Sequence, residues 1–378
     1  MTTDRPLRVA LIGSRGIPNR YGGYETLMEE LARRLVAAGL EVTVYCRRHL
    51  TEPGLTEFAG AELVVLPTIR TKHLDTPVHT LLSCIDAATR PYDAALVVNS
   101  ANAIFVPILR AGRIPVALHV DGIEKRRSKW GLLGTAVYGL SERLATVLPD
   151  RLITDARVIE EHYRERYGAP STVITYGVDA EPLPLPIELR GRLGIESGRY
   201  FLYVSRFEPE NNPHRVAQAY RAVGGDLPLV MVGGAPYAGA FIRSFSEDAD
   251  RRILFPGPIY GEDYRRLLSN ALAYIQATEV GGTHPALVEA MGYGSVVVVN
   301  DTPENREVAG ETALYFEASR PASLAEQLDW VLANPDALEP LRQAASARAG
   351  EHFNWDAVSE AYRTLFEEMA GRTPRITS

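Results

Sequence analysis

Short apolar runs alternate with amphipathic stretches along most of the chain. Residues Leu7–Ile12 have the character of a strand, and Glu25–Ala38 repeats its apolar positions with a helical period and ends before Gly39. Further short apolar runs with strand character are 41–46, 63–66, 94–99, 116–120, 152–154 and 172–175. This alternation predicts an α/β domain built on a parallel sheet.

A proline-rich segment interrupts the pattern. Glu181–Ile187 carries proline at positions 182, 184 and 186, which excludes a helix or a central strand and favours a stiff connector. We therefore predict two Rossmann-like parallel-sheet domains, 1–183 and 187–354, facing a cleft at the carboxyl ends of both sheets. The expected elements of the second half are strands at 200–205, 229–232, 253–255, 273–277 and 296–300, then helices at 321–333, 335–352 and 356–370.

Composition restricts the class of protein. The chain has 378 residues, too many for one ordinary core, and its net charge of −7 argues against nucleic acid as a partner. No apolar run approaches the roughly 18 residues that a membrane span needs, and the N-terminus lacks the build of a signal peptide. Cys46 and Cys84 show no metal-ligand spacing, so we expect two reduced, buried thiols in a cytoplasmic protein.

The most informative segment follows the expected strand at 273–277. An acidic residue, Glu279, precedes two glycines and a hydroxyl residue that can cap a helix, and Pro285 suits the first helical turn. Free N–H groups at such a helix start attract phosphate, and a carboxylate one turn later can accept hydrogen bonds from sugar hydroxyls. The segment therefore predicts a pocket for a sugar nucleotide. The expected donor contacts are Gly281, Gly282, Thr283, His284 and Glu289.

The loop after the first expected strand is a second candidate. Its glycines do not have the GxGxxG spacing, and the second strand ends in Cys46-Arg47 where a dinucleotide site needs an acidic residue, which disfavours an NAD-binding oxidoreductase. Gly22 and Gly23 precede a helix, so the backbone there can approach an anion or a sugar. A plain turn is the alternative, although long loops inside compact domains are usually functional.

Polar residues also follow the strand at 116–120. His119 and Asp121 stand at alternate positions and are expected to face one side, where they could contact a hydroxyl nucleophile or sugar hydroxyls. The alternative is a pair that merely caps the strand. The basic stretch Lys125–Lys129, beside Trp130, could meet a phosphate or a lipid head group, or be a solvated face.

Two further candidates lie in the second half. Arg206 ends the strand at 200–205, and a guanidinium pairs with phosphate oxygens in bidentate fashion, so it could stabilise a departing diphosphate. The alternative is a surface arginine. Ile259, in the segment after the strand at 253–255, could offer backbone groups to the edge of a base.

With these residues in view, the chain resembles retaining glycosyltransferases of the GT-B fold, family 4, most clearly over Tyr200–Phe316. The opening Ile-Gly-Ser-Arg-Gly-Ile-Pro-x-x-Tyr-Gly-Gly-Tyr-Glu-Thr, with His-Val-Asp-Gly-Ile-Glu and Arg-Phe-Glu-Pro-Glu-Asn-Asn, resembles a branch that contains bacterial rhamnosyltransferases of cell-wall and capsule assembly. The resemblance implies that a C-terminal helix, about 355–378, completes the first domain, and that neither a metal nor another cofactor is needed.

The chain departs from that family at two positions. The family's pair of glutamates is represented by Glu289, which the resemblance assigns to the ribose, while the first carboxylate position is occupied by glycine and Glu279 lies two residues earlier. The family's diphosphate-binding lysine is Asn211 here. Neutralisation of the diphosphate is therefore expected to depend on Arg206 and backbone N–H groups.

We accordingly predict a glycosyltransferase that moves a sugar, L-rhamnose from dTDP-rhamnose, to a hydroxyl of a glycan or of a polyprenyl-diphosphate-linked sugar, with retention. The candidate catalytic residues are His119, Asp121, Arg206 and Glu279, and a peripheral contact with the inner face of the membrane is expected through Lys125–Lys129. A transferase that uses a UDP-hexose or UDP-N-acetylhexosamine on a soluble natural product, a sugar-nucleotide epimerase and a non-catalytic nucleotide-sugar-binding protein remain as alternatives.

Overall fold

The computed structural model describes residues 5–19, 22–71, 73–122, 132–179, 181–235, 238–247 and 250–372, with side chains from residue 139 onward in the helix that starts at 132. The described chain divides into two compact units. The first unit runs to Thr175 and resumes at Trp355, and the second spans Tyr176–Asn354. Each unit is an α/β domain with its own sheet, which confirms the predicted fold class.

The chain passes from the first unit to the second ahead of the proline-rich segment. Val178 donates its N–H to the Phe353 carbonyl at 2.8 Å and pairs with Asn354 in a parallel bridge. Its side chain packs so closely on α10 that a Cβ added at Gly292 would lie 2.7 Å from it. The residues just before the prolines are therefore held by the second unit.

The sheet of the first unit has eight strands in the order β3-β4-β2-β1-β5-β6-β7-β8, and every neighbouring pair except β3–β4 is parallel. All residues of β5 and β6 are buried, as expected for parallel strands covered by helices on both faces. The strand order reverses between β1 and β5. The strands are β1 (Arg8–Ile12), β2 (Glu41–Arg47), β3 (Glu57–Phe58), β4 (Ala61–Leu66), β5 (Ala94–Val98), β6 (Val116–Val120), β7 (Arg151–Thr154) and β8 (Thr172–Val173).

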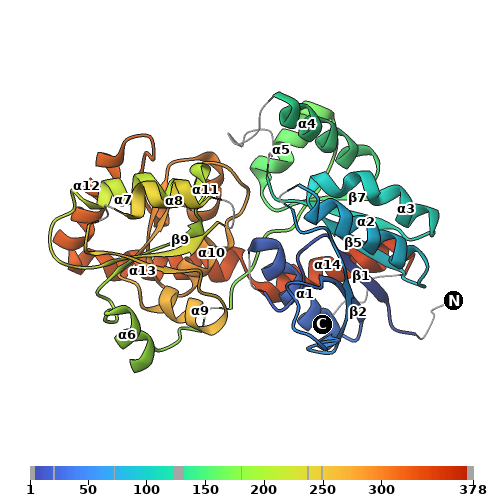
Figure 1. Ribbon diagram of the computed structural model, residues 1–378, viewed down its shortest axis with the longest axis horizontal. Coiled ribbons are helices and arrows are strands. Elements are labelled where there is room, and N and C mark those ends of the chain that lie inside the picture. The colour runs from blue at the N-terminus through green and yellow to red at the C-terminus, as the bar shows by residue number, and fades with distance from the viewer. Residues whose placement is uncertain are drawn as a thin grey trace. The chain divides into compact units, whose positions relative to one another are not determined.

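The last helix of the chain belongs to the first unit and packs beside α1 (Figure 1). Inside this unit the Tyr362 hydroxyl lies 2.5 Å from Nδ1 of His119 on β6, and both side chains are fully buried. This buried hydrogen bond attaches the helix to the middle of the sheet. The helical elements are α1 (Gly23–Ala37), α2 (Asp75–Ala88), η1 (Ser100–Phe105), α3 (Val106–Ala111), α4 (Leu132–Val147), α5 (Arg157–Tyr167) and α14 (Trp355–Met369).

The second unit has a six-stranded, all-parallel sheet in the order β11-β10-β9-β12-β13-β14. Counted along the unit, this order is 3-2-1-4-5-6, the strand order of a Rossmann fold, with its reversal between β9 and β12. The strands are β9 (Phe201–Arg206), β10 (Leu229–Gly234), β11 (Ile253–Gly257), β12 (Ala273–Gln276), β13 (Val296–Asn300) and β14 (Leu314–Phe316).

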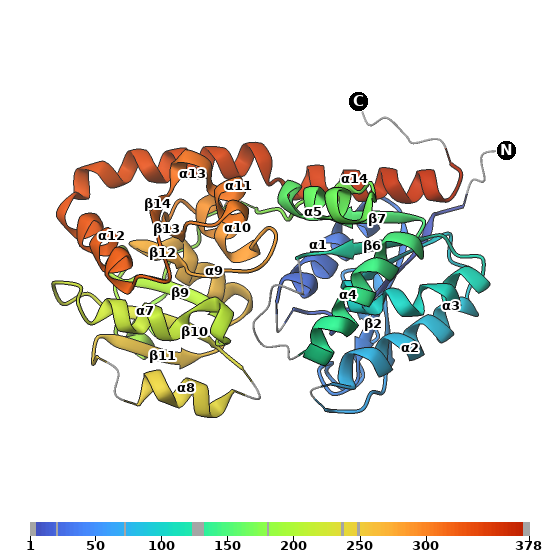
Figure 2. The same ribbon diagram turned by 90° about the horizontal axis from the view of Figure 1, so that it is seen from above.

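Helices cover both faces of this second sheet (Figure 2). No helix among the residues described in either unit is long and apolar enough to cross a bilayer. The helical elements of the second unit are α6 (Ile187–Leu193), η3 (Pro209–Asn211), α7 (Pro213–Tyr220), α8 (Gly239–Ser246), α9 (Gly261–Asn270), α10 (Pro285–Gly292), α11 (Pro303–Ala309), η4 (Gly310–Thr312), α12 (Pro321–Ala333), η5 (Pro335–Ala337) and α13 (Leu338–His352).

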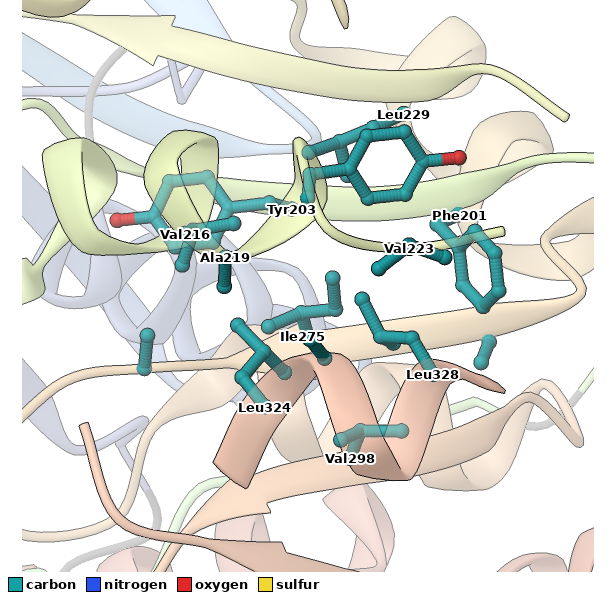
Figure 3. Packing of buried hydrophobic residues seen from close by; sticks show 14 of the residues in the cluster. Phe201, Tyr203, Val216, Ala219, Val223, Leu229, Ile275, Val298, Leu324 and Leu328 are labelled. Atoms are coloured by element: carbon teal, nitrogen blue, oxygen red, sulfur yellow. The ribbon is translucent and has the colours of Figure 1, made fainter. Parts of the chain in front are cut away.

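The core of the second unit follows the two-residue period of its central strand β9. Phe201 and Tyr203 point to the face covered by α7 and α12, where they pack with Leu324 and Leu328 (Figure 3). The alternate residues Leu202 and Val204 point to the opposite face, toward α10 and α13. Both faces are therefore apolar, and polar contacts concentrate where the strands end.

The first unit should lose stability on mild acidification. His79 and His119 are fully buried, and burial lowers the pKa of each imidazole to about 4. An unfolded histidine titrates near pH 6.5, so their stabilising effect is complete above that pH and decreases as pH falls toward 4. We expect each histidine to contribute about 2 kcal/mol to the loss between pH 7 and pH 5. Urea unfolding midpoints at pH 7, 6 and 5 measure the effect. His79→Leu should make the midpoint depend less on pH. A midpoint of the unmodified protein that does not change with pH would contradict the prediction.

Candidate active site

The loops that follow β9 and β12 leave the second sheet side by side, at its carboxyl edge. The two strands are neighbours, and the chain crosses to opposite faces after them, which is the arrangement that opens a binding crevice in Rossmann folds. The β9 loop contains Arg206 and Asn211, and the β12 loop contains Glu279 and Gly281–His284. Arg206, Asn211, Glu279 and Gly281–His284 therefore lie at the ends of neighbouring strands, and a shared role in binding stays a prediction.

Asn212 joins these two loops. It adopts a left-handed backbone conformation with φ +58°, which asparagine tolerates better than most residues. Its side-chain amide donates to the Ala277 carbonyl at 2.9 Å and to Oε1 of Glu279 at 3.0 Å, and the Glu279 N–H donates to the Glu210 carbonyl at 3.0 Å. These hydrogen bonds hold the β9 and β12 loops together. Asn212 is not among the residues that the sequence pattern indicated.

Glu279 has a mixed environment. Its side chain is 43% exposed, and Oε1 also accepts a hydrogen bond from Nη1 of Arg215 at 3.0 Å. Arg215 lies in the first turn of α7, so the carboxylate is fixed by two donors from the β9 side. A catalytic role for Glu279 remains a prediction, and the contacts seen here orient the loop.

Asn211 stands where the resembling family has a lysine, and its side chain carries no positive charge. It is buried, with Nδ2 donating to the Arg206 carbonyl at 2.7 Å, while its own carbonyl accepts from the Tyr203 hydroxyl at 2.7 Å. These bonds close the turn that follows Arg206. The Asn211 side chain therefore closes the loop, a donor contact at this residue stays a prediction, and the half-buried Arg206 carries a positive charge at the strand end.

Glu289 is oriented by a tyrosine from a neighbouring helix. The hydroxyl of Tyr264, on α9, donates to Oε2 of Glu289 at 2.5 Å. Burial, together with the carboxylate, raises the pKa of Tyr264 well above its usual value, so it is a constant hydrogen-bond donor at neutral pH. Sequence spacing alone could not reveal Tyr264, which lies 25 residues earlier.

The Gly281–His284 segment is tightly packed. Its first three residues are buried, and a Cβ added at Gly281 would lie 2.4 Å from Cε1 of His284. Helix α10 starts at Pro285 as predicted. The residue at its N-cap is His284, one residue after the hydroxyl residue Thr283. Ile259 packs its side chain against the core of the second unit.

In the first unit, the loop between β1 and α1 is folded back on its own helix. Gly22 is the N-cap of α1 and Gly23 its first residue. The buried carboxylate of Glu25, in the first turn, accepts the Arg15 N–H at 2.8 Å. Gly16 has φ +111°, and a Cβ there would lie 2.7 Å from Cβ of Cys46 on β2. The described part of the loop before residue 20 is therefore held against α1 and β2.

His119 and Asp121 differ in their access to solvent. The His119 imidazole is fully buried, hydrogen-bonded to Tyr362 and edge-on to Tyr24, whereas Asp121 is half-buried just beyond the strand. A buried imidazole in this position supports the sheet and α14, and contact of His119 or Asp121 with a substrate stays a prediction. Lys125–Lys129 lie outside the described residues.

Comparison with known families and structures defines the class of protein. Residues 187–349 match the family model described as Glycosyl transferases group 1, and residues 7–179 match a Domain of unknown function (DUF1972). Most of the second unit is thus matched by a glycosyltransferase family model. No curated protein matches the chain in sequence.

Solved structures resemble the chain over almost its whole length. Sucrose-phosphate synthase from Thermosynechococcus elongatus is 18% identical, with a TM-score of 0.80 over 97% of this chain and 99% of that one. HepE from Anabaena, solved with UDP and glucose, is 15% identical, with a TM-score of 0.78 over 96% and 100%. A UDP-forming α,α-trehalose-phosphate synthase from Burkholderia vietnamiensis is 13% identical, with a TM-score of 0.69 over 96% and 100%. The fold is therefore GT-B.

Replacing Asn212 should loosen the site and destabilise the second unit. Asn212→Ala removes one buried and one half-buried hydrogen bond and places alanine in a left-handed conformation, for an expected loss of about 2–4 kcal/mol. Urea unfolding with transfer assays checks this, with Asn334→Ala as a control that removes a hydrogen bond at a helix end. Stability and rate both equal to those of the unmodified protein would show that the loops do not depend on Asn212.

Proposed function

We propose that the protein transfers a sugar from a nucleotide-sugar donor whose nucleotide binds in the second unit, at the ends of β9 and β12. The observation that carries the proposal is the Tyr264–Glu289 pair, which fixes a carboxylate on α10 one turn after the start of the helix. The match of residues 187–349 to the family model described as Glycosyl transferases group 1 supports this assignment.

The residues at this strand edge suit the two polar parts of such a donor. Glu289 accepts hydrogen bonds from the ribose hydroxyls, because one of its oxygens is already held by Tyr264 and its charge favours hydroxyl donors. The diphosphate lies at the N-terminal end of α10, where Gly281 and Gly282 allow close approach of backbone N–H groups and the helix dipole favours an anion. Arg206 adds a positive charge from the end of β9.

In the proposed reaction the bond between the anomeric carbon and the diphosphate breaks while the acceptor oxygen bonds to that carbon. Retention is inferred from the family resemblance, with the departing phosphate oxygen taking the acceptor's proton on the same face. The protein's task is then to stabilise the diphosphate as its charge develops and to hold the acceptor, without a resident metal or covalent nucleophile. Asp121 is proposed as an acceptor contact and His119 as a positioning residue behind it.

The donor we propose is dTDP-L-rhamnose, on the resemblance of the β1–α1 loop and the strand ends to bacterial rhamnosyltransferases. The acceptor is a glycan hydroxyl or that of a polyprenyl-diphosphate-linked sugar. A UDP-hexose is the second candidate, because the HepE structure, of the same fold, was solved with UDP and glucose. The two candidates differ in the base and the sugar, and share the diphosphate and Glu289 contacts.

Glu289 and Tyr264 should contribute unequally to nucleotide binding. Glu289→Ala removes the ribose acceptor and should weaken binding of dTDP or UDP by more than tenfold, since hydrogen bonds to charged groups are worth about 1.5–3 kcal/mol. Tyr264→Phe removes only the orienting hydroxyl and should cost about threefold to tenfold. Titration calorimetry measures both, with Tyr315→Phe as the control on a hydroxyl bonded to the Gly310 carbonyl. Equal affinities in all three variants would remove Glu289 from the site.

The proposed activity is tested by nucleotide release from a panel of dTDP- and UDP-sugars, with and without a polyprenyl-diphosphate-linked sugar. Acceptor-dependent release of dTDP from dTDP-rhamnose is the expected result. Release only from a UDP-sugar would keep the transferase and replace the donor. Conversion of the donor without any acceptor would point to an epimerase and contradict the proposal.

A further inference from the structure

Helix α2 buries its polar side and exposes its apolar side. His79, Thr80 and Ser83 are fully buried, together with Cys84 and Ala87. On the outer side, Leu74, at the N-cap, is 46% exposed and Ile85 is 49% exposed. Val78, Leu81 and Leu82, which are partly exposed, continue the same stripe at helical spacing. This is the reverse of the usual pattern for a helix that covers a sheet.

The fold fixes the helix in this orientation. Arg47, buried at the end of β2, donates through Nη1 to Asp75 at 2.5 Å and through Nη2 to the Thr76 hydroxyl at 3.1 Å, so it holds the first turn of α2. Ser83 donates to the His79 carbonyl, and the small buried residues allow the helix to lie close to the sheet. If α2 rotated to bury its apolar stripe, the ion pair between Arg47 and Asp75 would break.

The apolar stripe carries no charge. The sequence has no charged residue from 76 to 85. Two more exposed apolar side chains lie on the loops that adjoin the first turn of α2: Ile69, 49% exposed, after β4, and Leu50, 39% exposed, after β2. The Arg48 N–H donates to the Leu66 carbonyl and ties these loops together. Isolated exposed apolar residues are ordinary, but a contiguous set of this kind marks an interaction site.

Basic residues lie at the same end of the stripe. Arg48, Arg70 and His73 are all exposed on the two loops that contain Leu50 and Ile69. The acidic groups nearby are Asp75, which is paired with Arg47; Asp86, which is paired with Arg90 at 2.8 Å; and the exposed Glu52. The exposed charges around the N-terminal end of α2 are therefore mainly positive, although the whole chain carries −7.

We propose that this face, the α2 surface, docks on a membrane that contains anionic phospholipid. The α2 surface consists of Leu50, Ile69, Leu74, Val78, Leu81, Leu82 and Ile85 with Arg48, Arg70 and His73. An uncharged aliphatic stripe with arginines at one end is the build of a helix that lies in the plane of the bilayer interface. The arginines meet the negative lipid head groups while the aliphatic side chains enter the acyl boundary.

The N-terminal end of the α2 surface lies at the carboxyl edge of the first sheet, where the Arg47 N–H donates to the Arg15 carbonyl of the loop after β1. Figure 2 shows α2 and α3 next to each other in the first unit, and η1 also packs against α2. The proposal stands apart from the donor assignment, because it depends on exposed residues of α2 and not on the second unit.

Sedimentation with vesicles tests the proposal on the full chain. The unmodified protein should bind phosphatidylcholine vesicles containing about one third phosphatidylglycerol at least tenfold more tightly than pure phosphatidylcholine. The double variant Leu74→Glu with Ile85→Glu should lose at least tenfold of that binding. Arg70→Gln, an exposed change that leaves the core intact, should lose about fivefold and show a weaker salt dependence.

Matched changes on the second unit provide the control. Ile187→Glu replaces a side chain that is 78% exposed, and Arg199→Gln replaces an exposed arginine, and neither should change vesicle binding. No binding of the unmodified protein to anionic vesicles, or equal binding by the α2 and control variants, would overturn the proposal. A dimer in solution that only the α2 variants dissociate would overturn it in favour of a contact between two copies of the chain.

Discussion

The hydrogen bonds of Asn212 are the constraint on which the second unit depends. A Rossmann sheet places the ends of β9 and β12 next to each other, but the loops that follow have no backbone ladder to hold them. Asn212 supplies the missing connection by donating to Ala277 and Glu279, and its left-handed backbone turns the chain into α7. The positions of Gly281, Glu289 and Arg206 relative to one another follow from this connection. A phosphate site made of backbone N–H groups requires that fixed spacing.

The same principle operates in the first unit with different side chains. The loop after β1 is held by the buried Glu25, and the loop after β2 is held by Arg47 and Asp75. The Arg47–Asp75 pair stabilises the protein only as a pair, because removing one partner would leave an uncompensated charge. The Arg47–Asp75 pair has a second consequence, since it fixes α2 with its apolar stripe outward. The Arg47–Asp75 pair therefore holds the loop after β2 and also fixes the outward orientation of the apolar stripe on α2.

The sequence predicts the strands and the two-domain α/β organisation well, because both depend on local apolar periodicity. The start of α10 at Pro285 is another local feature, and the structure confirms it. Contacts made across long sequence distances were beyond such reasoning. His119 was expected at a strand end open to substrate, but α14, more than two hundred residues later, covers it with Tyr362. The Tyr264–Glu289 bond, the role of Asn212 and the inverted burial of α2 likewise become visible only when the tertiary packing is known.

The most direct test of the account is a crystal structure of the protein with dTDP or UDP bound. The account predicts that the diphosphate lies against the backbone N–H groups of Gly281–Thr283, within reach of Arg206. The ribose hydroxyls should donate to the Glu289 oxygen that Tyr264 does not hold. A nucleotide bound in the first unit, or in the second unit with its ribose away from Glu289, would contradict it.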